Sequence, residues 1–133
     1  MTAKNDLKKY KAHYYEVKYL EKEIKEMYNT VKAVNYDEKT GHGGTDDLTL
    51  AVVTHIMKRQ EEFEKRLQQL REEEAEILSR IQQIEDGEVC RVLIARYIEF
   101  KPWAKIQREM HYSESGLMRL HRTGLDELDR KVK

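Results

Sequence analysis

Apolar residues recur at alternating intervals of three and four over four heptads between positions 53 and 84. This spacing keeps one side of an α-helix apolar along its whole length, and it is typical of a coiled-coil seam. A continuous helix from Asp46 or Asp47 to Ile84 is about 55 Å long, and a helix of that length cannot bury its own seam. The sequence therefore calls for a partner helix. Two seam positions are polar interruptions, Gln60 and Glu74. The apolar seam positions are Val53, Ile56, Phe63, Leu67, Leu70, Ile77, Ile81 and Ile84.

A second amphipathic segment, about residues 6–34, precedes this seam and can supply the partner. Asp6 can cap its start. The Tyr side chains on this segment occur at helical spacing, which favours core or interface packing over base stacking. Its apolar positions are Leu7, Tyr10, Tyr14, Val17, Ile24, Tyr28 and Val31, with Glu21 as the polar interruption.

The polar, Gly-containing run of residues 35–46 separates the two segments. It lacks the GxxxxGK[ST] pattern of a phosphate-binding loop, so we interpret it as a flexible linker. We expect residues 1–87 to form an antiparallel helical hairpin, or coiled coil, around this linker. A hairpin monomer and a coiled-coil homodimer both satisfy the seams, and we favour the homodimer.

The composition agrees with long helices. Charged residues make up 38% of the 133-residue chain, hydrophobic residues make up 39%, and there is one Pro, whereas roughly 25% charge is usual in a globular domain. The only cysteine, Cys90, excludes an intrachain disulfide and favours a reducing compartment. Residues 1–11 lack the apolar stretch of a secretory signal, and no apolar run approaches the roughly 18 residues of a membrane span. We expect an all-α, cytoplasmic protein that has no membrane partner.

The zero net charge hides an uneven distribution along the chain. Residues 1–34 carry eight Lys against five acids, residues 35–87 carry seven bases against thirteen acids, and residues 88–133 carry ten bases against seven acids. Two mildly basic ends therefore flank an acidic middle. This distribution is weak support for nucleic-acid binding at one end, and solvated helix faces explain the first two segments equally well. It does not indicate strong non-specific DNA binding by bulk charge.

The C-terminal segment, residues 88–133, has the pattern of a separate domain of shorter helices. We expect a first helix over about 88–99, a second over about 102–110, and a third from the N-cap residue Ser113 to about residue 130. A helix, a tight turn and a Ser-capped helix together predict a DNA-binding helix-turn-helix. The residues expected to form its shared core are Ile106, Met110, Tyr112, Leu117 and Leu120.

The outward face of this predicted helix-turn-helix carries the candidate DNA contacts. Arg119 and Arg122 lead, because a guanidinium matches guanine or phosphate in bidentate geometry; the alternative is a solvated helix face. We expect Lys101, Lys105 and Arg108, at the start of the second helix and along it, to contact phosphates. The remaining candidates are Glu114, Ser115 and Met118.

Other chemistry-bearing residues favour structural roles. We expect Trp103 to be a core residue, and His121 to be packed or hydrogen-bonded, since neither a second His nor the Cys lies at metal-ligand spacing. Cys90 lies on an apolar stripe without a paired base, which favours a buried thiol. We find no nucleophile–base pair, metal cluster or phosphate loop, and therefore expect a protein that is not an enzyme and needs no cofactor or metal.

The segment from Arg91 to Leu128 resembles region four of bacterial sigma factors. Nearly the whole chain is similar to small phage-encoded regulators of the ArpU and RinA type. At three positions, Gln107, Gly116 and Gly124, the chain departs from that family's pattern. The matching pieces are Arg96-Tyr97-Ile98, Trp103, Ile106, Tyr112-Ser113, Arg119-Leu120-His121, Leu125 and Leu128.

The resemblance implies a phage or prophage transcription regulator that acts on late genes in the bacterial cytoplasm and binds double-stranded promoter DNA. RNA polymerase would be a further partner. One alternative is an adapter that binds RNA polymerase or another protein through the same module and never touches DNA. Another is a small subunit of a DNA-packaging machine, although that arrangement normally places the DNA-binding module first.

Overall fold

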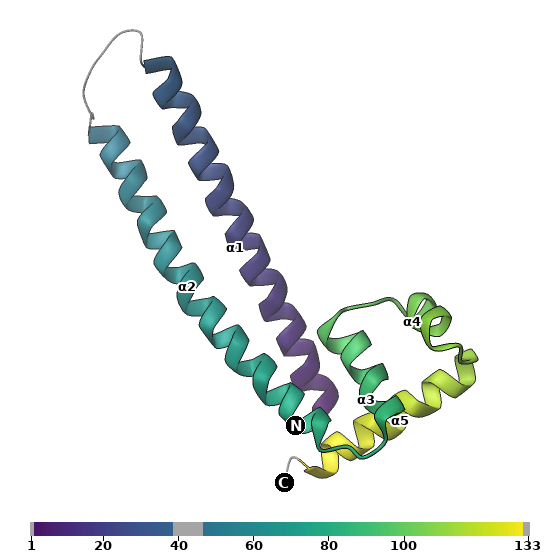
Figure 1. Cartoon of the computed structure of the whole chain (residues 1–133). Coiled ribbons are helices and arrows are strands. Elements are labelled where there is room, and N and C mark those ends of the chain that lie inside the picture. The colour runs from purple at the N-terminus through teal and green to yellow at the C-terminus, as the bar shows by residue number, and fades with distance from the viewer. Residues whose placement is uncertain (1, 39–46, 132–133) are drawn as a thin grey trace. The chain divides into compact units, whose positions relative to one another are not determined.

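A computed structural model describes residues 2–38 and 47–131 of the chain (Figure 1). The described residues form helices and no strand, which confirms the all-α prediction. In chain order the elements are α1 (Ala3–Glu38), α2 (Asp47–Gln82), α3 (Gly87–Leu93), a π-helical turn η1 (Ile94–Ile98), α4 (Trp103–Met110) and α5 (Glu114–Lys131).

Helix α1 is longer than its sequence pattern predicts. It begins at Ala3, and Thr2 rather than Asp6 caps it, because the Thr2 hydroxyl accepts a hydrogen bond from the backbone N–H of Asn5 at 3.3 Å. It ends at Glu38, so the prediction of a linker over 35–46 is wrong for residues 35–38. Neither Gly nor Pro occurs before Gly41 to interrupt the helical hydrogen bonds. Residues 39–46 of the predicted linker lie outside the described residues.

The chain divides into two compact units. The first contains residues 1–13 and 71–133, and the second contains residues 14–70. The first unit thus combines the start of α1 and the end of α2 with all the shorter helices.

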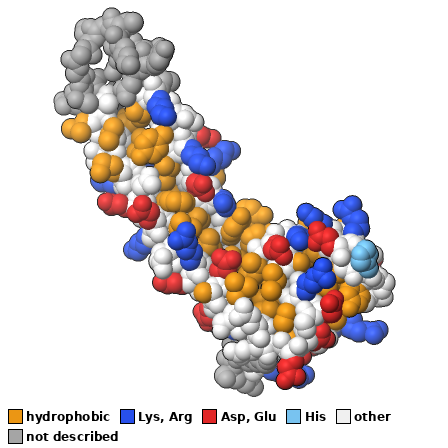
Figure 2. All heavy atoms as spheres, in the orientation of Figure 1, with side chains coloured by type: hydrophobic (Ala, Val, Ile, Leu, Met, Phe, Trp, Pro, Cys, Tyr) orange, Lys and Arg blue, Asp and Glu red, His pale blue; other side chains and the backbone are white. Residues whose placement is uncertain are grey.

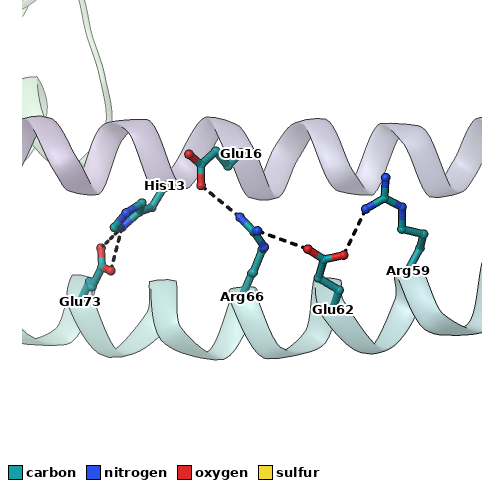
Figure 3. Close-up of polar contacts among 6 residues, drawn as sticks. All are labelled: His13, Glu16, Arg59, Glu62, Arg66 and Glu73. Atoms are coloured by element: carbon teal, nitrogen blue, oxygen red, sulfur yellow. Dashed lines mark hydrogen bonds and ion pairs between the residues drawn. The ribbon is translucent and has the colours of Figure 1, made fainter.

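The second unit is an antiparallel pair of helical segments. Val17, Leu20 and Ile24 of α1 and Ile56 and Leu70 of α2 are its buried apolar residues. Ion pairs across the seam join Glu16 to Arg66 at 3.2 Å and Glu23 to Arg59 at 3.0 Å. The later residue of α1, Glu23, pairs with the earlier residue of α2, Arg59. The two helical segments therefore run antiparallel. Within α2, Glu62 bridges Arg59 and Arg66 (Figure 3).

Parts of both expected seams in this unit are exposed. Val53 is 37% exposed, and Tyr28 is 48% exposed. Tyr15 and Tyr19 are 53% and 70% exposed, so they are not core residues of this chain, and packing at an interface stays a prediction for them.

The first unit buries apolar residues from each of its helices. They include Ala3, Leu7 and Tyr10 from α1, Ile77 and Ile81 from α2, and apolar residues of α3, α4 and α5. Asp6 pairs with Arg80 at 3.5 Å, and His13 contacts Glu73 at 2.8 Å (Figure 3). The backbone N–H of Ala3 donates to the Asp129 carboxylate at 2.6 Å, which ties the first turn of α1 to α5.

Candidate nucleic-acid interface

Helices α4 and α5 share one apolar core with α3 and η1. Val92 of α3, Ile106 of α4 and Leu117 of α5 are at most 1% exposed, and Met110 is buried beside them. Tyr112 and Leu120 are half-buried against the same cluster, so all five residues expected to form this core do so. Helix α4 ends at Met110, and the left-handed backbone of its C-cap residue His111 (φ 59°) turns the chain toward α5.

Ser113 caps α5 as its sequence predicts. Its hydroxyl accepts a hydrogen bond from the backbone N–H of Gly116 at 3.1 Å, and its carbonyl accepts one from the N–H of Leu117 at 2.9 Å. The first of these bonds satisfies an N–H that has no partner inside the helix, and the second is the first regular hydrogen bond of α5. A Cβ at Gly116 would lie 3.1 Å from the Ser113 hydroxyl, so the cap itself favours glycine here.

Gly124 is the close-packing point between α5 and α3. A Cβ there would lie 2.8 Å from Leu93 Cδ1 and 3.0 Å from Val89 Cγ1. Leu93 and Val89 are 0% and 1% exposed, so neither side chain has free space. The glycine lets the two helices approach, which explains a residue that otherwise weakens a helix.

The polar candidates on α5 lie on its surface. Ser115, Arg119 and Arg122 are exposed, and so is Glu114 in the first turn. Among the described residues, none forms an ion pair with Arg119 or Arg122. These two guanidinium groups can therefore meet a ligand without first losing an internal partner.

Met118 departs from the predicted outward face. It is half-buried and packs against the core cluster of Ile106 and Leu117. The reason is geometric: Met118 directly follows Leu117, so a long flexible side chain at this position can lie over the edge of the core. Its role as a base contact is thereby weakened.

The basic candidates around α4 fall into two groups. Lys105 and Arg108 are exposed, and no described residue forms an ion pair with either. Lys101 instead hydrogen-bonds Glu109 at 2.9 Å and lies 3.6 Å from Glu99. The bond to Glu109 is the main cause that raises the pKa of Lys101, and the same bond lowers the pKa of Glu109. The positive charge of Lys101 is thus balanced by two acidic side chains of the same chain.

A polar aromatic cluster joins η1, α4 and α5. The rings of Tyr97 and His121 stack with centroids 5.6 Å apart, and the Tyr97 hydroxyl lies 2.5 Å from His121 Nε2. Trp103 meets His121 edge-on at 4.8 Å. Burial, and then the charges of Lys4 and Arg96, lower the pKa of His121, which favours the neutral ring as hydrogen-bond acceptor. His121 is packed and hydrogen-bonded, as expected.

Arg96 is a residue whose position the sequence did not reveal. Its guanidinium lies 4.7 Å from the centre of the Trp103 ring and donates to the Lys101 carbonyl at 3.2 Å. The π-helical turn η1 contains Arg96, and turns of this kind insert one extra residue into a helix. Trp103 itself is half-buried against the core cluster, which agrees with its expected core role.

The thiol of Cys90 and the possible metal ligands of the chain are further candidates for a site. The Cys90 thiol contacts the carbonyls of Ile81 and Ile84 at 3.2 and 3.3 Å. Over residues 2–38 and 47–131, no group of three or more His, Cys, Asp or Glu side chains is placed to hold a metal ion. Among the same residues, every helix is too short or too polar to cross a membrane.

No protein-family model, no curated protein and no solved structure matches this chain.

Proposed function

We propose that this chain is a sequence-specific DNA-binding transcription regulator of a phage or prophage, acting on late genes through α4 and α5 as a sigma region four-like helix-turn-helix. The observation that carries this proposal is the state of Arg119 and Arg122. Both are exposed on the Ser113-capped helix, and neither has an ion-pair partner among the described residues. The proposal assigns the chain no catalytic role, cofactor or metal, and places it in the bacterial cytoplasm.

In this mechanism the N-terminal half of α5 enters the major groove, which is about 12 Å wide and accepts one helix. Arg119 donates to the edge of a guanine, while Arg122, one turn later, contacts a second base or a phosphate. The Ser115 hydroxyl lies on the same surface. Lys105 and Arg108 contact phosphates and so set the position of α5 along the duplex.

The acidic residue Glu114 affects which part of the DNA can meet the first turn of α5. A carboxylate at the start of a helix is stabilised by the helix dipole, but it repels phosphate. It accepts a hydrogen bond from the amino group of cytosine. Glu114 therefore favours a site in which a cytosine, rather than the DNA backbone, meets the first turn of α5.

The proposal is tested with the double variant Arg119→Ala/Arg122→Ala. A bidentate contact discriminates bases by about 1–3 kcal/mol, so loss of both weakens binding to the preferred DNA by about 30-fold or more. The matched control is Lys58→Ala/Lys65→Ala, which removes the same charge from exposed positions on α2. Binding is measured by fluorescence anisotropy, and helicity by circular dichroism. Equal affinity of both variants, with helicity retained, would exclude the two arginines from DNA recognition.

A second candidate function is that of an adapter that contacts RNA polymerase or another protein. Hydrophobic side chains on the visible face of the long helices favour it (Figure 2). In the second unit, Leu50 and Met57 are each 60% exposed. The same residues would serve a coiled-coil homodimer. Capture of RNA polymerase without any DNA mobility shift favours the adapter, whereas a mobility shift that Arg119→Ala/Arg122→Ala abolishes favours the regulator.

A further inference from the structure

Three lysines follow one another on a single face of the first turns of α1. Lys4, Lys8 and Lys11 are spaced by four and three residues, and all three side chains are exposed. We propose that these lysines form a second DNA-backbone site, which binds phosphates beside the segment that α5 contacts. This inference rests on the proposed function and extends it to a part of the chain outside α4 and α5.

The start of α1 is packed into the same compact unit as α5. The N–H of Ala3 donates to Asp129 on α5 at 2.6 Å, and Leu7 is 2% exposed. Tyr10 packs against Phe100, in the segment before α4, with ring centroids 5.9 Å apart. The three lysines are therefore carried by a helix segment whose position relative to α4 and α5 is fixed by packing.

The lysine face adjoins the C-terminal helices at two points. Lys11 Nζ lies 5.9 Å from the centre of the Phe100 ring. Lys4 is close enough to α5 for its charge to lower the pKa of His121, which directly precedes Arg122. The lysine face therefore lies beside the segment before α4 and beside α5.

These lysines have no acidic partner in the described part of the chain. The acidic residue of the same turns, Asp6, pairs with Arg80 on a different flank of α1. Asp129 accepts the N–H of Ala3. Lys4, in the first turn of α1, also opposes the helix dipole, so its position is unfavourable for α1 itself. A ligand of opposite charge accounts for this arrangement better than folding does.

The spacing of the lysines suits a DNA strand. Lys4 and Lys11 lie about 10 Å apart along the helix axis, at about 1.5 Å per residue. That distance is roughly the axial rise of three base pairs, at about 3.4 Å per phosphate on one strand. Contacts of this kind add affinity without adding sequence information.

The test is the salt dependence of binding by the variant Lys4→Gln/Lys8→Gln/Lys11→Gln. Each phosphate contact adds about 0.9 to the slope of log K against log salt, so the variant should have a slope shallower by about 2.7. The control is Lys18→Gln/Lys22→Gln/Lys25→Gln, which removes the same charge from the same helix within the second unit. The probe is the duplex that the wild-type chain enriches from random DNA, and circular dichroism checks that both variants fold.

A shallower slope in the first variant alone supports the site. A wild-type slope in the first variant, or an equal fall in both variants, overturns it while leaving the proposed function intact. If the wild-type chain enriches no duplex, the proposed function has failed, and the lysine site fails with it.

Discussion

Replacing Gly124 by Ala should destabilise the fold even though alanine is the better helix former. The change gains about 1 kcal/mol of helix propensity. Its Cβ, however, would lie 2.8 Å from Leu93 Cδ1 and 3.0 Å from both Leu93 Cγ and Val89 Cγ1. Contacts this short force buried atoms to move, and overpacking of a core typically costs about 1–3 kcal/mol. Because Leu93 is fully buried, we expect the cost to exceed the gain, with a net loss of about 1 kcal/mol.

Gly87→Ala is the matched control. Nothing lies within 4 Å of a Cβ at Gly87, the first residue of α3. This variant should be as stable as the wild-type chain or slightly more stable. Thermal unfolding followed by circular dichroism measures both, and a loss of 1 kcal/mol corresponds to about 4 °C in a chain of this size. A Tm for Gly124→Ala at or above that of Gly87→Ala would refute the argument that α3 and α5 require a glycine at their contact.

Three further predictions concern single residues. Ser113→Ala removes the cap of α5 and should cost about 1 kcal/mol in urea unfolding. Glu109→Gln frees Lys101 from its main partner and should tighten DNA binding at low salt, as anisotropy would show. His121 has a lowered pKa in the folded chain, so the unfolded chain binds the proton more readily. Its contribution to stability is therefore complete above its ordinary pKa of about 6.5 and falls as the pH drops below that value, and His121→Phe should remove this part of the pH dependence.

The periodicity of apolar residues was sufficient to predict both long helices. The seam residues Ile56, Leu70, Ile77 and Ile81 are buried, because a pattern of three and four fixes one face of a helix whatever covers it. The same pattern did not show where α1 ends. Residues 35–38 are polar, but nothing in them breaks a helix, and polarity alone does not.

The features of the candidate site that depend on neighbouring residues in the sequence were predictable. Ser113 caps α5, and Arg119 and Arg122 are exposed, because a cap and a helical face depend on neighbours in sequence. Tertiary contacts decided the remainder. Lys101 precedes α4 and pairs with Glu109 near the end of that helix, eight residues later, and sequence spacing does not reveal such a pair.

The role of Gly124 in α5 also depends on tertiary contacts that the sequence does not show. In the sequence, Gly124 is only a residue that departs from the family's pattern and that weakens a helix. The 2.8 Å approach of Leu93 favours close packing. Likewise, the place of Arg96 over Trp103 depends on the extra residue in η1, and no local pattern announces a π-helical turn.

The central claim is that the exposed arginines of α5 read a DNA sequence. Its most direct test is selection of bound duplexes from random DNA at two salt concentrations, with the wild-type chain and with Arg119→Ala/Arg122→Ala in parallel. The account predicts one motif that the wild-type chain enriches at both salt concentrations and that the variant does not enrich. Enrichment of the same motif by both proteins, or of none by the wild-type chain, would contradict it.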